Sequence, residues 1–173
     1  MDKIYQKYVI SIKIKKLKAY KLKLESKWTF WFHKLYEDDW SINSYKKLYT
    51  FDNIAEFWCL YNNLKYLHNG MFFLMQNDIL PIYEDKNNIN GGYWSIKILN
   101  NNILKIWTDL SIELIRGNLD KKNIVSGITV SYKKKFYIIK IWIIDKKYNN
   151  LSFLDLNNIN IKREEILYNN FLN

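Results

Sequence analysis

The spacing of apolar residues predicts several strands in the first part of the chain. KWTFWFHKL (27–35) is a run of strand length with high β-propensity and bulky side chains on both faces. Shorter runs of the same character are YKKLYTF (45–51), MFFLMQ (71–76) and YWSIKIL (93–99). The polar segments YEDDWSINS (36–44) and 81–92 lie between these runs and predict loops.

Two other segments carry apolar residues at helical intervals. The first set is Ile54, Phe57, Trp58, Tyr61 and Leu64, and the second is Ile103, Ile106, Trp107, Leu110 and Leu114. Asn53 and Glu56 have the spacing of a helix N-cap and its N3 position, and Gly117 suits a helix end. The pattern therefore predicts two amphipathic helices.

The remainder of the chain is predicted to return mainly to strands. GITVSYKKK (127–135) and FYIIKIWII (136–144) indicate two adjacent strands of a hairpin, between about Ile124 and Asp145. LSFLDL (151–156) predicts a last strand, and IKREEILYNNFL (161–172) predicts a final short helix.

Together these elements predict an α+β fold. The strands run in antiparallel order, and the helices are too few for regular βαβ units, so we expect helices on one face of a sheet and an uncovered second face. An open face with aromatic loops at its rim is where a flat ligand would bind. The single Pro and five Gly leave no linker, so we expect one domain at 22–173, preceded by a basic arm at 1–21.

Composition narrows the function. The seven Trp, fourteen Tyr and nine Phe exceed what the core of a domain this size requires, and exposed rings stack on nucleobases with a gain of about 1–3 kcal/mol per base. The net charge of +10 favours polyanionic partners, although AT-rich coding would also produce it.

The scarcity of Cys and His excludes several other classes. Cys59 is the only cysteine, so no disulfide can form within the chain and a reducing compartment is indicated. With only His33 and His68 beside it, we expect no metal site, no cofactor and no catalytic residues. No apolar run reaches the roughly 18–20 residues of a membrane span. We expect a cytoplasmic protein, with the nucleus as an alternative location.

Three features are candidates for binding chemistry. They are Trp40 in a polar loop, the pair Tyr83 and Glu84 in a second loop, and Lys133 with Lys135 on a strand, where spacing i and i+2 would place both on one face. Each alone is also typical of an ordinary surface or core position.

The order of several segments resembles the messenger-RNA cap-binding initiation factors of the 4E family, over roughly 22–145. The matching segments are KWTFWF, EDDW, FDNIAEFWCLYN, PIYEDKNNINGGYW, KIWTDLSIELIRG and SGITVSYKKKFYIIKIW. The resemblance implies a curved antiparallel sheet with about three helices on its convex face and a cap-binding groove on the concave side.

The resemblance also implies roles for residues. Trp40 and Tyr83 would sandwich 7-methylguanine, Glu84 would read the guanine edge, and Lys133 and Lys135 would hold the phosphates of capped messenger RNA. Tyr83 stands where the family has a second Trp, and Lys133 where it has Arg. The family's C-terminal loop that helps close the site is not matched after Trp142.

A second surface is implied on the two helices. Ile54, Trp58, Asp109 and Ile112 would dock the helical motif Tyr-x4-Leu-hydrophobic of an initiation scaffold protein, or of a repressor that competes with it. The predicted protein is a monomeric translation initiation factor and not an enzyme. Two alternatives remain at this point: a cap-binding repressor homologue that does not engage the scaffold, and a non-specific binder of single-stranded RNA.

Overall fold

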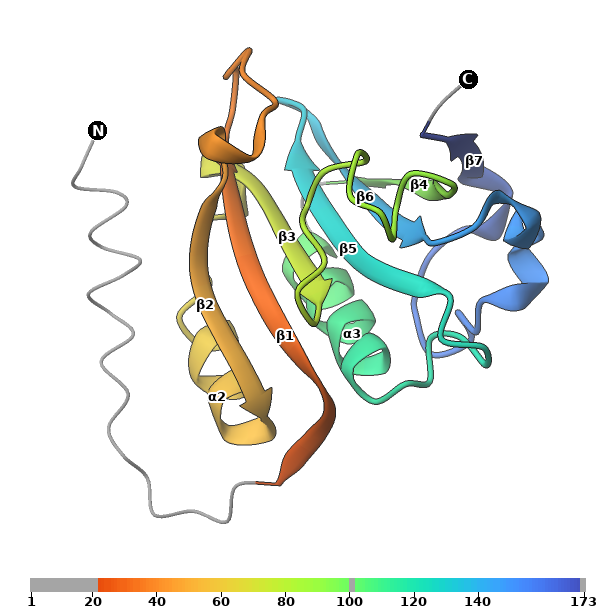
Figure 1. Ribbon diagram of the computed structural model, residues 1–173, viewed down its shortest axis with the longest axis horizontal. Helices are drawn as coiled ribbons and strands as arrows, with labels where there is room; N and C mark the ends of the chain where they lie inside the picture. The colour runs from red at the N-terminus through yellow and green to blue at the C-terminus, as the bar shows by residue number, and fades with distance from the viewer. Residues whose placement is uncertain (1–21, 100–101, 172–173) are drawn as a thin grey trace.

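A single antiparallel sheet organises the structure, a computed structural model that describes residues 22–99 and 102–171 (Figure 1). The predicted N-terminal arm, 1–21, lies outside the described residues. Within the described ranges the sheet has seven strands in the order β2-β1-β3-β5-β6-β4-β7, and all neighbours are antiparallel. The strands are β1 (Lys23–Lys34), β2 (Lys46–Asn53), β3 (Gly70–Gln76), β4 (Gly92–Leu99), β5 (Val125–Tyr132), β6 (Phe136–Ile143) and β7 (Ile166–Asn170).

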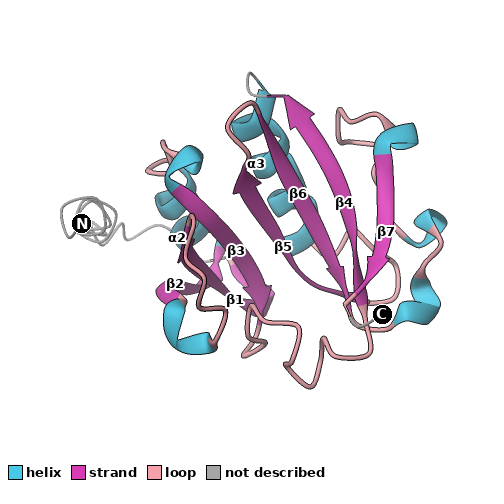
Figure 2. Cartoon of the chain, turned by 90° about the horizontal axis from the view of Figure 1, so that it is seen from above, coloured by secondary structure: helices cyan, strands magenta, loops and turns pink. Residues whose placement is uncertain are grey.

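Two α-helices of the described residues, α2 (Ile54–Tyr61) and α3 (Ile103–Ile115), lie on the same face of this sheet (Figures 1 and 2). The α+β class and the position of the helices are therefore confirmed. The expected count of about three helices is wrong for the described ranges. Short 3-10 helices occur at Ile42–Ser44, Leu67–Asn69, Lys146–Tyr148, Leu151–Phe153 and Arg163–Glu165.

The two C-terminal predictions are also wrong. LSFLDL contains the 3-10 helix Leu151–Phe153 where a strand was expected, and its only ladder contact is an isolated bridge from Leu154 to Asp120. In place of the expected final helix, Arg163–Glu165 form a 3-10 helix and Ile166–Asn170 form β7, which pairs with the outer edge of β4. The charged residues 162–165 favour a helix locally, but Ile166 and Tyr168 suit a strand, and β7 covers an edge of β4 that would otherwise expose unpaired backbone groups.

The main core lies between the sheet and the helices. In β1, Trp28 and Phe30 face this core, where Phe30 stacks on Phe72 of β3 with ring centres 5.7 Å apart. The α-helices contribute Phe57 and Trp107, both almost fully buried. Alternation along β1 places Trp31 and His33 on the opposite face of the sheet.

The concave face is less bare than the sequence predicted. A second apolar cluster on that face consists of Tyr45, Phe73, Met75 and Trp142. Half-buried side chains pack around it from β1, from β3, from the loops and from the residue after β7, namely Trp31, Ile42, Met71, Ile79, Ile82 and Phe171. Loop 77–91 crosses in front of the sheet in Figure 1, so this cluster fixes the loop to the strands.

Local signals at the helix ends are confirmed. The Asn53 side chain accepts a hydrogen bond from the Glu56 backbone N–H at 3.0 Å, which caps α2. After α3, Gly117 has a φ of +70°, and its N–H donates to the Leu114 carbonyl at 3.0 Å.

A buried relay of hydroxyl groups joins the two helices. The Tyr61 hydroxyl donates to Ser111 Oγ at 2.6 Å, and Ser111 Oγ donates to the Trp107 carbonyl at 2.7 Å. Tyr61 and Ser111 come from different helices and are both buried. The relay therefore fixes α2 and α3 relative to one another.

Replacing Tyr61 with Phe should lower the free energy of unfolding by about 1 kcal/mol, because the ring is kept while one buried hydrogen bond is lost. Urea denaturation would measure the change. Tyr36→Phe is the matched control, since Tyr36 is 79% exposed and should change nothing. Equal unfolding midpoints for Tyr61→Phe and the wild-type protein would show that the relay does not join the helices energetically.

Candidate functional site

The concave face holds a cavity of about 530 Å³. Its walls come from the loop after β1, loop 77–91, strands β3, β4, β5 and β6, and the end of β7. Trp40, Tyr83, Glu84 and Lys133 all line it. Four of the five residues predicted to bind the ligand are thus brought together from three separate parts of the chain.

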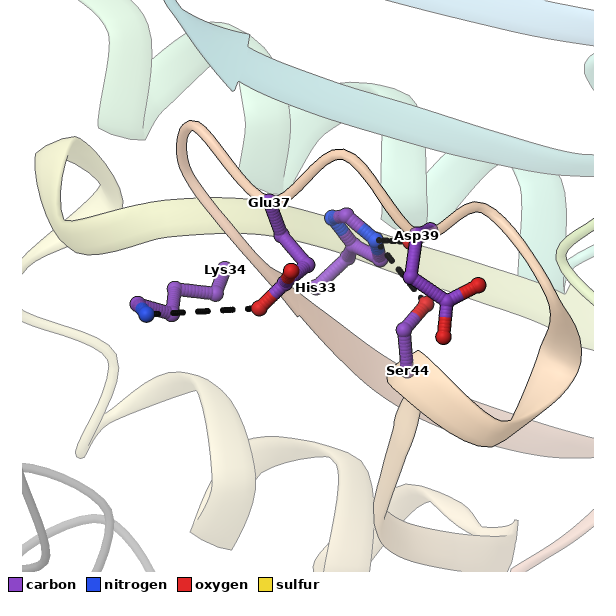
Figure 3. Close-up of polar contacts among 5 residues, drawn as sticks. All are labelled: His33, Lys34, Glu37, Asp39 and Ser44. Atoms are coloured by element: carbon purple, nitrogen blue, oxygen red, sulfur yellow. Dashed lines mark hydrogen bonds and ion pairs between the residues drawn. The ribbon is translucent and has the colours of Figure 1, made fainter.

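Trp40 is positioned by the buried side chain of His33. The two rings stack with centres 4.5 Å apart and planes 6° apart. His33 Nε2 lies 3.0 Å from the Asp39 carbonyl and 3.1 Å from Ser44 Oγ, which ties the imidazole to the loop that carries Trp40 (Figure 3). Trp40 is nevertheless 50% exposed, so its ring remains available to a ligand.

Tyr83 presents a second half-exposed ring in the same cavity. It is 42% exposed, and its ring lies roughly parallel to that of Phe171, with centres 6.5 Å apart. A hydrogen bond to the Glu84 carboxylate, together with the charge of that group, raises the pKa of the Tyr83 phenol. Burial, followed by the charge of Glu84, raises the pKa of Tyr45, so both phenols stay neutral at physiological pH.

A buried amide holds the loop that carries Tyr83 and Glu84. Asn88 Nδ2 donates to the carbonyls of Leu80 and Ile82 at 3.1 and 2.8 Å. Asn88 Oδ1 accepts from Ser126 Oγ of β5 at 2.8 Å. Asn88 is fully buried, and these three bonds join loop 77–91 both to itself and to the sheet.

The structure does not place Lys133 and Lys135 on one strand face as the sequence predicted. Strand β5 ends at Tyr132, so Lys133 and Lys135 lie in the turn before β6 and do not share a strand face. Lys134 between them adopts a left-handed φ of 61°. Lys133 lines the cavity, but Lys135 is not among the lining residues. The turn breaks the alternation on which the expectation for Lys135 depended.

Sequence reasoning missed Lys140, which also lines the cavity. Its Nζ lies 3.8 Å from the centre of the Tyr93 ring. Burial, and to a smaller extent the charge of Lys133, lower the pKa of Lys140. The alternation along β6 could have revealed this position, because Ile139 and Ile141 face the core and the lysine between them must face the concave side.

Residues after Trp142 were also missed. Phe171 follows β7, and its ring centre lies 4.8 Å from that of Trp142. Asn169 and Asn170 line the cavity beside it. The C-terminal segment, to which the sequence assigned no binding role, therefore forms part of the wall.

The cavity combines aromatic surface with charges of both signs. Its charged lining residues are the carboxylate of Glu84 and the ammonium groups of Lys133 and Lys140. Such a site can accept a flat ring that offers hydrogen-bond donors and carries an anionic group. Within 22–99 and 102–171, no three His, Cys, Asp or Glu side chains gather as metal ligands would, and no helix is long and apolar enough to cross a membrane.

The predicted partner surface lies on the opposite face of the sheet. Ile54 and Trp58 of α2 are 36% and 41% exposed. On α3, Asp109 forms an ion pair with Lys105 at 2.6 Å, and Ile112 packs partly against the core. Since Ser111 receives the hydrogen bond from α2, the four residues lie on two helices that are directly connected.

Comparison with known proteins gives the family. The model of the family described as Eukaryotic initiation factor 4E matches residues 23–169. The chain belongs to the eukaryotic initiation factor 4E family. The match extends past 145, where the recognisable motifs end, and includes most of β7.

Several relatives and solved structures are similar to this 4E-family chain. Initiation factor isoform 4E of Prunus domestica is 31% identical over 129 residues, 69% of this chain and 60% of the relative. Initiation factor 4E-1 of Arabidopsis thaliana is 32% identical over 127 residues, 69% of this chain and 54% of the relative. The chain thus matches less than two-thirds of the length of these relatives.

The solved structures support the fold. A complex of C. elegans eIF4E-3 with the 4E-binding protein Mextli and cap analog has a TM-score of 0.76 at 20% identity, covering 86% of this chain and 92% of that one. Ascaris suum eIF4E-3 with m7G cap has a TM-score of 0.75 at 22% identity, covering 87% and 92%.

Asn88→Ala should lower the free energy of unfolding by about 2–3 kcal/mol, because it leaves buried carbonyls and a hydroxyl without partners. It should also speed amide hydrogen exchange across loop 77–91 more than in α3. Asn87→Ala, at an exposed neighbour, is the control and should have little effect on either measurement. Unchanged exchange in the loop of Asn88→Ala would contradict the positioning role.

Proposed function

We propose that this protein binds the 7-methylguanosine cap of messenger RNA in the concave cavity. The observation that carries the proposal is the meeting of Trp40, Tyr83 and Glu84 in one cavity, although Trp40 and Tyr83 are 43 positions apart in the sequence, 83 minus 40. Each aromatic ring is half-exposed and already fixed on its loop. A ligand therefore meets a largely preformed site.

The two rings suit a methylated base. Methylation at N7 gives guanine a delocalised positive charge, and electron-rich aromatic faces attract such a cation by about 0.5–2 kcal/mol beyond ordinary contact. Tyr83 offers a smaller and less electron-rich face than a Trp would, so this chain should discriminate methylated from plain guanine chiefly through Trp40.

Glu84 suits the guanine edge. Guanine N1–H and N2–H are two adjacent donors, and one carboxylate can accept from both, whereas adenine offers no such pair. Glu84 and Tyr83 are sequence neighbours that both line the cavity, so one bound base could meet the carboxylate at its edge and the ring at its face.

The relatives support this reading. The Ascaris suum structure contains an m7G cap, and the C. elegans structure contains both a cap analog and the 4E-binding protein Mextli. By analogy, the convex surface of Ile54, Trp58, Asp109 and Ile112 would bind a scaffold or repressor through a Tyr-x4-Leu-hydrophobic helix. We propose a translation initiation factor that works in the cytoplasm, delivers capped messenger RNA to a scaffold and performs no catalysis.

The wild-type protein should bind 7-methyl-GTP at least about tenfold more tightly than GTP, because tenfold corresponds to only about 1.4 kcal/mol and one desolvated cation–π contact can supply it. Isothermal titration calorimetry measures both constants. Trp40→Ala should remove the preference for 7-methyl-GTP over GTP. Trp31→Ala, the matched control beside the concave cluster, should lower the stability of the protein and retain that preference. Equal binding of both nucleotides by the wild-type protein would indicate a non-specific RNA binder and overturn the proposal.

Trp58→Ala should weaken binding of a Tyr-x4-Leu-hydrophobic peptide by about tenfold or more, since exposed aromatic anchors dominate such contacts. The affinity for 7-methyl-GTP should not change. Fluorescence polarisation of a labelled peptide would measure it. Leu104→Ala, exposed on α3 at 43%, provides a control of similar exposure away from the proposed contact. If the wild-type protein bound the cap but no such peptide, the protein would fit a cap-binding repressor homologue instead.

A further inference from the structure

The cavity contains two ammonium groups that no acid of the described chain neutralises. Among residues 22–99 and 102–171, the ion pairs within 4.0 Å involve other lysines and an arginine, and neither Lys133 nor Lys140 takes part. Glu84 is the one carboxylate in the cavity lining, and none of these ion pairs joins it to either lysine. Two free cations in a cavity create a site for an anion.

Lys140 is held in place more firmly than a surface lysine. It lies on β6 between β4 and β5, opposite Ser95 and Thr129 in the two ladders. Its ammonium rests on the Tyr93 ring at 3.8 Å, a cation–π contact that limits the directions in which it can point. The side chain is half-buried, and burial lowers its pKa. An ammonium that has lost part of its hydration gains more from an anionic ligand than an exposed one does.

The position of Lys140 along β6 matters as much as its charge. Ile138, Lys140 and Trp142 alternate on the concave side and all line the cavity. Trp142 lies beside Phe171 in the aromatic part of the cavity, and Lys133 lies just before β6 begins. Along the hairpin of β5 and β6, Lys140 therefore lies between Trp142 and Lys133. A ligand with its base among the rings and its tail directed to Lys133 would pass over this ammonium.

We propose that Lys140, held on the ring of Tyr93, forms with Lys133 the subsite for the ligand's 5′-phosphates, and that Lys135 takes no part in it. This inference rests on the proposed cap function, because that function supplies the phosphates. It replaces the lysine pair expected from the sequence with one lysine from the turn and one from the middle of a strand. Tyr93 acts as a positioning residue that keeps the ammonium in the cavity.

The test compares three ligands that differ only in phosphate: 7-methyl-GTP, 7-methyl-GMP and 7-methylguanosine. Lys140→Met keeps the length of the apolar stem and removes the charge. This substitution should weaken binding of 7-methyl-GTP by about tenfold or more at low salt. The affinity for 7-methylguanosine should stay within about twofold of the wild-type value. The loss should shrink as salt is raised. Lys135→Met, the matched control from the same turn, should bind all three ligands as the wild type does.

Two further measurements separate a phosphate contact from a structural effect. Lys140→Arg should retain most of the affinity for 7-methyl-GTP, because it restores a cation in the same place. Thermal unfolding of Lys140→Met should match wild type or exceed it, since a half-buried charge has been replaced by an apolar group. The subsite would be overturned if Lys140→Met weakened binding of all three ligands equally. It would also be overturned if Lys135→Met lost as much affinity for 7-methyl-GTP as Lys140→Met does.

A failure of the proposed cap recognition would give a different result from a failure of the phosphate subsite. If the wild-type protein bound GTP and 7-methyl-GTP equally, cap recognition would be wrong. In that case, weaker binding of both GTP and 7-methyl-GTP by Lys140→Met, with unchanged binding of 7-methylguanosine, would still support the phosphate subsite. Unchanged triphosphate binding in Lys140→Met would overturn the subsite even if wild-type cap recognition held.

Discussion

Successive side chains of a β-strand point to opposite faces of the sheet, and both surfaces of this protein depend on that alternation. In β1, Phe30 packs in the main core while Trp31 and His33 lie on the concave side of the sheet. In β6, Ile139 and Ile141 are completely buried in the main core, and Ile138, Lys140 and Trp142, which alternate with them, line the cavity. The register that builds the core therefore also sets the position of the binding residues, and a slip of one residue would destroy both.

Rigid strands alone do not place the two rings proposed to bind the base, because both rings lie on loops. Each loop is tied to the sheet by one buried polar side chain. His33 bonds the loop of Trp40 and also stacks on the ring itself, while Asn88 bonds the loop of Tyr83 to β5. Buried polar groups are costly without partners, so each loop has few alternative positions. The cost of ordering the rings is thus met during folding, and less of it remains when a ligand binds.

Much of this architecture could be predicted from the pattern of residues. Alternating and helical spacings located β1 to β6 and both α-helices, and Asn53 and Gly117 marked helix ends correctly. The motifs around Trp40 and Tyr83 pointed to a common site, which periodicity alone could not have shown because it carries no information on contacts between distant loops. The errors have physical causes as well. Residues 166–170 of the predicted final helix pair with the free edge of β4, and the turn at Lys134 removes Lys135 from the strand face.

In the proposed complex, the aromatic rings of the cavity enclose a methylated guanine. Nuclear magnetic resonance can observe the N7-methyl protons of 7-methyl-GTP directly in the complex. We expect an upfield ring-current shift of that methyl resonance on binding, with Overhauser effects to the ring protons of Trp40 and Tyr83. A methyl resonance that keeps its free chemical shift at saturating protein, or that shows Overhauser effects only to rings outside the cavity, would contradict it.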